Sequence, residues 1–200
     1  TVALIVEGNT IQLLQSERLV LNYLQRLSGI ATRTYSYAHK IEHTPCTVLD
    51  TRKTTPGLRV LEKWAVALGG GGNHRMGLYD MVMLKDNHID FAGGIPEAVA
   101  RTKAYLAKNN RALAIEVETR NLTEVKAALE ANVDRIMLDN FSISETKEAV
   151  AFIAGRTEVE SSGGITHHTL VPYAECGVDF ISVGALTHHI KGLDMSLKAL

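Results

Sequence analysis

Cysteine is scarce in this chain. Its 200 residues include only two, Cys46 and Cys176, which lie far apart and form no C-x-x-C pair. Such a count argues against a disulfide framework and against a structural zinc site. Chains without disulfides are typical of reducing compartments, so we expect an intracellular protein that resides in the cytoplasm.

An excess of charge of one sign is missing as well. The 21 Lys and Arg residues nearly balance the 22 Asp and Glu residues, so we expect no general attraction to nucleic acid or to an anionic membrane. No apolar run reaches the roughly 18 residues of a transmembrane helix. The start of the chain lacks a basic stretch followed by an apolar one, which predicts no signal peptide. Because it opens without methionine on the apolar segment 2–6, we expect the tail of a longer polypeptide.

What the chain does contain is typical of a globular protein. It is 46% hydrophobic and 22% charged, and its length suggests one domain, or one domain plus a fragment. The first predicted helix begins at Ser16, a suitable N-cap, and ends before Gly29. Its apolar positions cover much of the helix surface, so we expect both sides to be packed.

From residue 47 onward, short apolar runs alternate with stretches of helical period. Pro96 suits the first turn of one helix, and Ser142 with Glu145 forms a capping box before another. The polar residues that end successive runs are spaced by about one βα unit, which implies a parallel sheet covered by helices. Six regularly spaced strands favour a closed or nearly closed barrel, whose active site lies at the strand C-termini. The predicted strands lie at 47–51, 81–84, 113–117, 136–138, around 159 and at 180–183.

A group of cations is concentrated between residues 52 and 88. Several of them follow predicted strands or the flexible run 69–72, so they suit a ligand with several negative groups, because arginine pairs bidentately with carboxylate or phosphate. The alternative is that they are solvated surface charges, and this alternative is strongest for Arg59 and His88. The group comprises Arg52, Lys53, Arg59, His74, Arg75, Lys85 and His88.

Three carboxylates form a second group, Glu116, Glu118 and Asp139. Residues two apart on a strand face the same side, so Glu116 and Glu118 are both expected to point into the barrel. Carboxylates at neighbouring strand ends can hold Mg²⁺ through a ribose-pyrophosphate ligand, or stabilise positive charge on a sugar. They can equally serve as buried partners of the cations.

Glycine-rich loops follow the last two predicted strands, at 161–164 and 183–185. Backbone amides freed by glycine cradle phosphate, and in α/β barrels the loops after the last two strands often do so. Plain turn glycines are the alternative. From the residues alone, the prediction is a barrel with a polyanion site.

Longer motifs make the chain similar to a known family, the quinolinate phosphoribosyltransferases, over nearly its whole length. The runs that carry the resemblance are SERLVLNYLQRLSGIAT (16–32), LDTRKTTPGLR (49–59), GGGGNHRMGLYDMVMLKDNHI (69–89), EVE (116–118), MLDNF (137–141), ESSGGI (160–165) and GVDFISVGALTHH (177–189).

The resemblance implies an incomplete TIM-like α/β barrel at 47–200, with residues 1–46 as the end of an N-terminal α/β sandwich domain that includes an interface helix. It also implies a homodimer or higher homo-oligomer, in which one subunit covers the barrel mouth of its neighbour. The implied reaction transfers phosphoribosyl from phosphoribosyl pyrophosphate to quinolinate with loss of CO₂, and yields nicotinate mononucleotide and pyrophosphate for de novo NAD biosynthesis.

The resemblance also implies a role for each site residue. Quinolinate would be bound by Arg52, His74, Arg75 and Lys85, with Arg18 contributed by the partner subunit. Phosphoribosyl pyrophosphate would be bound by Lys53, Glu118, Asp139, Ser162, Gly163 and Gly184. Of these, Lys53, Glu118 and Asp139 would be catalytic, and Glu118 and Asp139 would hold Mg²⁺ through the substrate.

Two alternatives stay open. A nicotinate phosphoribosyltransferase would bind one carboxylate and would need fewer cations. A barrel that only binds a phosphorylated ligand, without catalysis, is the second.

Overall fold

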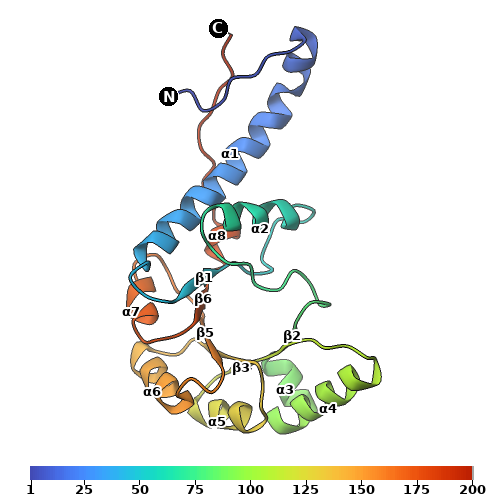
Figure 1. The fold of residues 1–200 in the computed structure, drawn as a ribbon, viewed down its shortest axis with the longest axis vertical. Helices are drawn as coiled ribbons and strands as arrows, with labels where there is room; N and C mark the ends of the chain where they lie inside the picture. Colours follow the sequence, from blue (N-terminus) through green and yellow to red (C-terminus); the bar gives the residue numbers. More distant parts are fainter. Residues whose placement is uncertain (200) are drawn as a thin grey trace.

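The computed structural model describes residues 1–199 as a long helix joined to an α/β layer (Figure 1). The strands are β1 (Thr47–Leu49), β2 (Val82–Leu84), β3 (Ile115–Thr119), β4 (Arg135–Asp139), β5 (Glu158–Ser162) and β6 (Phe180–Ser182). The helices are α1 (Thr10–Lys40), α2 (Arg59–Leu68), α3 (Asp86–Ala92), α4 (Ile95–Lys108), α5 (Leu122–Glu130), α6 (Ile143–Ile153), α7 (Leu170–Ala174) and α8 (Ala185–His188). Each of the six predicted strands is therefore present.

All strand pairs in the sheet are parallel, and the strand order is β1-β6-β5-β4-β3-β2. The sheet curves towards a barrel, but β1 and β2 end it as separate edges. Beside β1, the chain forms a single parallel bridge between Leu49 and Gly72. The segment from there to β2 spans the open side as a loop (Figure 1). The expected incomplete α/β barrel is confirmed.

The two faces of this sheet have opposite character. Side chains of one face, such as Val117, Ile136 and Ile181, are fully buried in the apolar core that the helices cover. Because side chains alternate along a strand, the neighbouring residues face the barrel interior. Glu116 on β3 and Glu160 on β5 take such positions and are also fully buried. The interior of the barrel is therefore unusually rich in charge.

Both predicted ends of the first helix were wrong. The helix begins after Asn9, whose side chain accepts hydrogen bonds from the amides of Ile11 and Gln12. Ser16 lies inside the helix and donates to a carbonyl one turn earlier. The helix continues through Gly29. Glycine is needed at this position because a Cβ would overlap the backbone of Lys191. This glycine serves a close approach between segments, and it does not end the helix.

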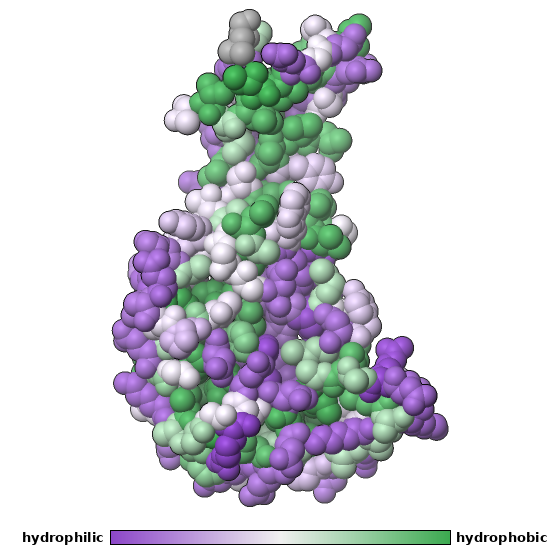
Figure 2. All heavy atoms as spheres, viewed as in Figure 1, coloured by the Kyte–Doolittle hydropathy of each residue, from purple (hydrophilic) through white to green (hydrophobic). Residues whose placement is uncertain are grey.

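The two halves of α1 have different surroundings. Its C-terminal half packs on α2, β1 and α8, and Ile30 and Tyr37 are buried there. Its N-terminal half projects from the barrel with exposed apolar side chains, including Leu14 and Leu19, so the expectation that both sides are packed was wrong there. Figure 2 shows hydrophobic residues gathered on this projecting part. The division into domains at residue 46 stays a prediction.

Among the described residues, none of the helices has both the length and the apolarity that a membrane crossing requires.

Candidate active site

The polar residues predicted to end the strands do meet at one edge of the sheet. Because all strands are parallel, their carboxyl ends lie on the same side. The residues placed there are Arg52 and Lys53 after β1, Lys85 after β2, Glu118 on β3, Asp139 on β4, Ser162 on β5 and Gly184 after β6.

Lys85 and Glu118 form an ion pair at this edge. Lys85 Nζ lies 2.6 Å from Glu118 Oε2, where the lysine side chain is about half exposed and the glutamate side chain is largely buried. The pair places a cation and a carboxylate at adjacent strand ends, where an anionic ligand or a ligand-bound metal ion can reach both. Since the lysine is mobile and solvated, a ligand carboxylate can compete for it.

The ends of β4 and β5 interlock. Asn140 adopts a left-handed backbone conformation, and its amide donates to the carbonyl of Ser162 at 2.9 Å. Its side-chain amide donates to Asp139 Oδ2 at 2.7 Å, so Asn140 also orients that carboxylate. Gly163 has φ +93°, and a Cβ on it would overlap the Asn140 side chain. Glycine is therefore required at 163 on both steric and conformational grounds.

Lys53 lies against the turn between β6 and α8. The hydroxyl of Thr187 donates to the Lys53 carbonyl at 2.8 Å. A Cβ on Gly184 would lie 2.8 Å from His188 Nε2 and 3.2 Å from Lys53 Cδ. His188 therefore also borders the predicted phosphate loop, although the sequence alone assigned it no role. Burial, together with the nearby His189 and Lys53, lowers the pKa of His188.

Arg75 approaches the site from the loop on the open side of the barrel. Burial and the neighbouring Arg52 lower the pKa of its guanidinium. Its Nη1 donates to the carbonyl of Met81 at 3.2 Å, which fixes the side chain across the loop. The structure therefore brings the cations at 52 and 75 together, as a dianionic ligand would require.

Two other cations of the sequence cluster have structural partners. Arg59 donates to the carbonyls of Met76 and Arg52 at 3.1 and 3.2 Å, and so ties two loops together. His88 Nδ1 accepts the amide of Lys85 at 3.0 Å at the start of α3. Arg18 is exposed and belongs to the N-terminal half of α1.

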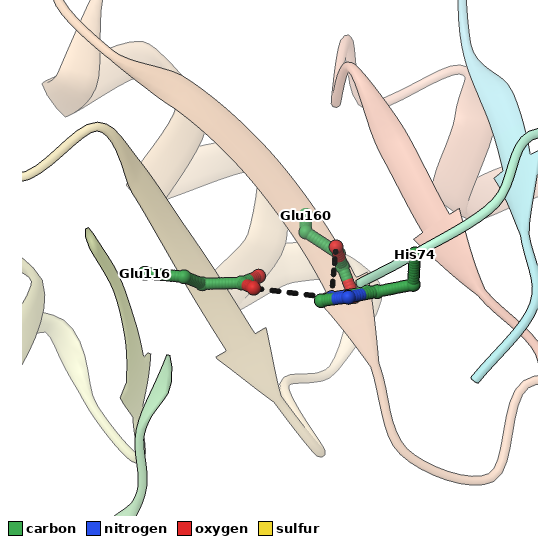
Figure 3. Close-up of side chains that lie close together, drawn as sticks. All are labelled: His74, Glu116 and Glu160. Atoms are coloured by element: carbon green, nitrogen blue, oxygen red, sulfur yellow. Dashed lines mark ion pairs between the residues drawn. The ribbon is translucent and has the colours of Figure 1, made fainter. Parts of the chain in front are cut away.

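His74 lies deeper than the other predicted ligand residues. Its Nε2 is 3.0 Å from Glu116 Oε2 and 3.3 Å from Glu160 Oε2, and all three side chains are buried (Figure 3). Burial alone would lower the pKa of His74, but the two carboxylates outweigh it and raise the pKa to about 9. Burial raises the pKa of Glu116, whereas His74 and Arg135 outweigh burial at Glu160 and lower its pKa.

The sequence did not point to Glu160, or to a second buried ion pair between Lys63 of α2 and Asp50. Asp50 Oδ1 also accepts the amide of His74 at 2.8 Å, and Lys63 donates to the carbonyl of His74 at 2.8 Å. The backbone at residue 74 is thus held by buried charges. One signal for Glu160 was available, because it lies two residues before Ser162 on the same strand and therefore faces the same side.

The carboxylates at 118 and 139 fit the expected Mg²⁺ only in part. Among residues 1–199, the one group of three or more metal-ligating side chains is His74, Glu116 and Glu160. Glu118 and Asp139 supply two carboxylate groups from the mouth. Mg²⁺ usually binds one or two carboxylates and completes its shell with water and substrate phosphates, so the pair fits an ion that arrives with a pyrophosphate.

A parallel α/β barrel with converging cations and carboxylates at its mouth defines a class of anion-binding, phosphate-handling barrels. Comparison with known proteins identifies the family. Residues 30–198 match the model of the quinolinate phosphoribosyl transferase C-terminal domain. The chain therefore belongs to the quinolinate phosphoribosyltransferase family.

Individual relatives agree with this assignment. The chain is 48% identical to the mitochondrial quinolinate phosphoribosyltransferase [decarboxylating] 2a of Nicotiana tabacum, over 96% of the chain and 59% of that protein. It is 47% identical to the probable nicotinate-nucleotide pyrophosphorylase [carboxylating] of Synechocystis, over 99% of the chain and 67% of that protein. The chain thus spans about three fifths of the length of the tobacco relative.

Solved structures are similar over the same region. The crystal structure of NadC from Streptococcus pyogenes superposes with a TM-score of 0.91 at 44% identity, covering 96% of this chain and 66% of that one. The nicotinate-nucleotide pyrophosphorylase of Francisella tularensis gives 0.90 at 46% identity, over 94% and 66%. The Pyrococcus furiosus enzyme, at 18% identity and a TM-score of 0.69, shares the fold.

Proposed function

We propose that this chain supplies the catalytic barrel of a quinolinate phosphoribosyltransferase of de novo NAD biosynthesis. The reaction would transfer phosphoribosyl from phosphoribosyl pyrophosphate to quinolinate, and would release pyrophosphate and CO₂. The observation that carries the proposal is the convergence of Arg52, Arg75 and Lys85 with Glu118 and Asp139 at one barrel mouth. Family membership and the names of the relatives support the same reaction.

The charges divide into two regions that match the two substrates. Arg52, Arg75 and Lys85 line the open side of the barrel, where they would pair with the two carboxylates of quinolinate. Lys53, which follows β1 and lies against the turn between β6 and α8, would bind phosphoribosyl pyrophosphate together with the backbone of Ser162, Gly163 and Gly184. Both loops carry backbone amides of the kind that bind phosphate, and the positive φ of Gly163 favours glycine at that position.

The chemistry needs positioning and electrostatics from the protein, and it needs no covalent intermediate on the enzyme. As pyrophosphate leaves, positive charge develops on the ribose, and the carboxylate of Glu118 or Asp139 would stabilise it. The quinolinate nitrogen then attacks C1 of the sugar. The resulting pyridinium loses its 2-carboxylate as CO₂, and the carbanion left at C2 takes up a proton from water. Glu118 and Asp139 would hold a substrate-bound Mg²⁺, which would supply positive charge beside the departing pyrophosphate.

We further propose that the enzyme is a homodimer or higher oligomer, with Arg18 reaching the site of a neighbouring subunit. Arg18 lies on the projecting half of α1, among exposed apolar residues such as Leu14 and Leu19. Exposed apolar surface of this kind is typical of interfaces. Sedimentation of the complete polypeptide tests the assembly, and a monomer with full activity would contradict it.

The test of the reaction is a comparison of two acids as acceptors. The complete polypeptide is incubated with phosphoribosyl pyrophosphate, Mg²⁺ and either quinolinate or nicotinate, and the mononucleotide and pyrophosphate are measured. We expect turnover with quinolinate, because three cations suit a dicarboxylate. Faster turnover of nicotinate would favour the related monocarboxylate enzyme instead.

A barrel that binds a phosphorylated ligand without catalysis is tested by substitution at the mouth. We expect Lys53→Ala and Glu118→Ala each to abolish product formation, since one removes a phosphate-binding cation and the other a carboxylate beside the ribose. Turnover at the wild-type rate in either variant would show that these roles are misassigned.

A further inference from the structure

The His74 ring is held inside the barrel on both of its nitrogens. On one side, Nε2 faces Glu116 and Glu160, which are fully buried (Figure 3). On the other side, Nδ1 accepts the amide of Arg75 at 2.7 Å. The side chain of His74 is only 5% exposed. In this arrangement neither nitrogen points to a ligand at the mouth.

The hydrogen bond from Arg75 fixes where the ring proton lies. A nitrogen that accepts an amide proton carries no proton of its own, so Nδ1 is the bare nitrogen and Nε2 bears the hydrogen. That hydrogen lies on the side of the two carboxylates. Any further proton that the trio retains therefore lies on a carboxylate oxygen, because Nε2 already bears a hydrogen and Nδ1 accepts one.

The two carboxylates have little else to bind. Neither oxygen of Glu116 has a hydrogen bond of good geometry, and Oε1 of Glu160 has none either. Arg135 Nη1 approaches Oε2 of Glu160 at 3.3 Å. A buried carboxylate without hydrogen bonds is costly to the fold, so its presence calls for a specific role. The only role visible at Glu116 is its attraction to His74.

The segment that His74 anchors, residues 73–81, is not hydrogen-bonded into the sheet. Residues 73–81 span the open side of the barrel, where a closed barrel would have a regular strand. The backbone of His74 is held by Asp50 and Lys63, and its ring is held by Glu116 and Glu160. The next residue is Arg75, whose amide is bound by that same ring. Four buried charged groups thus fix the point from which Arg75 reaches the mouth.

We propose that Glu116 and Glu160 are positioning residues, which hold the His74 ring and through it the Arg75 main chain in the orientation that quinolinate binding needs. This inference rests on the proposed function for its substrate. It changes the role of His74, which acts on quinolinate through Arg75 and not as a direct ligand of a carboxylate.

The same three side chains also have the composition of a metal site, since their ligand atoms all lie within 4.8 Å of one another. A metal would require the lone pair of Nε2, but the Arg75 amide places the proton there. With the proton on Nε2, that nitrogen has no lone pair to offer a metal ion. Zinc binding by this trio is accordingly an outcome that would overturn the proposal.

The kinetic test uses Glu116→Gln and Glu160→Gln in the complete polypeptide. Glutamine keeps the shape and removes the charge. Because the charge of each carboxylate attracts the Nε2 hydrogen of His74, its loss should loosen the ring, and we expect the KM for quinolinate to rise roughly tenfold or more. The KM for phosphoribosyl pyrophosphate should stay within about twofold of wild type, since the phosphoribosyl site is untouched. If the two carboxylates only stabilise the fold, the substitutions should lower the melting temperature without raising the KM for quinolinate relative to that for phosphoribosyl pyrophosphate.

Glu158→Gln is the matched control. Glu158 lies on the same strand and binds the same arginine, Arg135, at 2.8 Å, but it is exposed and does not contact His74. It should leave both KM values unchanged. Equal effects of the three substitutions on quinolinate binding, or no effect of the two buried ones in folded protein, would overturn the proposal.

A second measurement needs neither activity nor a variant. ¹⁵N NMR of histidine-labelled wild-type protein reports the tautomer of His74. We expect a bare Nδ1 and a protonated Nε2. The opposite tautomer, or a resonance shift on adding Zn²⁺ alone, would refute the proposed positioning of the His74 ring by Glu116 and Glu160. If the wild-type enzyme fails to turn over quinolinate, the proposed function fails, while this measurement still decides the arrangement of the trio.

Discussion

Lys63→Met is expected to destabilise the fold strongly. Lys63 is 1% exposed on α2 and forms a buried ion pair with Asp50, while also donating to the carbonyl of His74 at 2.8 Å. Methionine has a similar length and fills the same space, so the loss is that of the charge and its hydrogen bonds. Removing one partner of a buried pair typically costs about 3–5 kcal/mol, because the other charge is left buried alone.

The loss of stability in Lys63→Met should depend on pH, because Asp50 becomes neutral when it takes up a proton. Burial raises the pKa of Asp50, and Lys63 opposes that effect. Without the lysine the pKa rises further. A carboxyl group whose pKa is raised by folding stabilises the fold at low pH and loses that contribution as pH rises through the folded value. The deficit of Lys63→Met should therefore be larger at pH 8 than at pH 5.

Urea denaturation at both pH values measures this difference. At pH 8 we expect the free energy of unfolding to fall by about 3 kcal/mol or more, a large part of the total stability of a typical domain. Lys103→Met is the control, because Lys103 also donates to two main-chain carbonyls, at 2.7 and 2.9 Å, but is exposed. A loss below about 1 kcal/mol at pH 8, or a loss equal to that of the control, would refute the reasoning.

Two further predictions concern the phosphate loop and the buried trio. Gly163→Ala should cost about 2 kcal/mol of stability and weaken phosphoribosyl pyrophosphate binding, because the residue has φ +93° and its Cβ would overlap Asn140; calorimetry measures both, and unchanged affinity would exclude the loop as a phosphate site. Burial raises the pKa of Glu116, so the proton that the trio retains stabilises the fold at low pH, and that contribution is lost as pH rises through the folded value. Denaturation curves from pH 6 to 10 should therefore show a fall in stability that is absent in Glu116→Gln.

The strand ends were predictable from the sequence because they depend on local signals. Runs of apolar residues at regular intervals located the strands, and parallel strands necessarily bring Lys85, Glu118 and Asp139 to one edge. The capping box at Ser142 was also local, and it is present in the structure. The roles of the site residues stay predictions.

Features that depend on contacts distant in sequence were not predictable. The partner of Lys63 is Asp50, 13 residues earlier, and nothing in the helix pattern of α2 distinguishes this lysine from a solvated one. Glu160 meets His74 only because the loop at 73–81 enters the barrel. Gly29 resembled a helix terminator, since the close approach of Lys191 is a tertiary contact. In each case the deciding interaction joins segments whose proximity no local pattern encodes.

The open side of the barrel has a mechanical consequence. The radius of a closed barrel is fixed by its number of strands and their stagger. Here β1 and β2 are not joined by hydrogen bonds, so no ladder sets the distance between the strand that precedes Arg52 and the strand that precedes Lys85. That distance depends on the loop between them and on the charges that pin it. The width of the barrel mouth on this side can thus be altered by changing one loop, while the register of every strand pair stays the same.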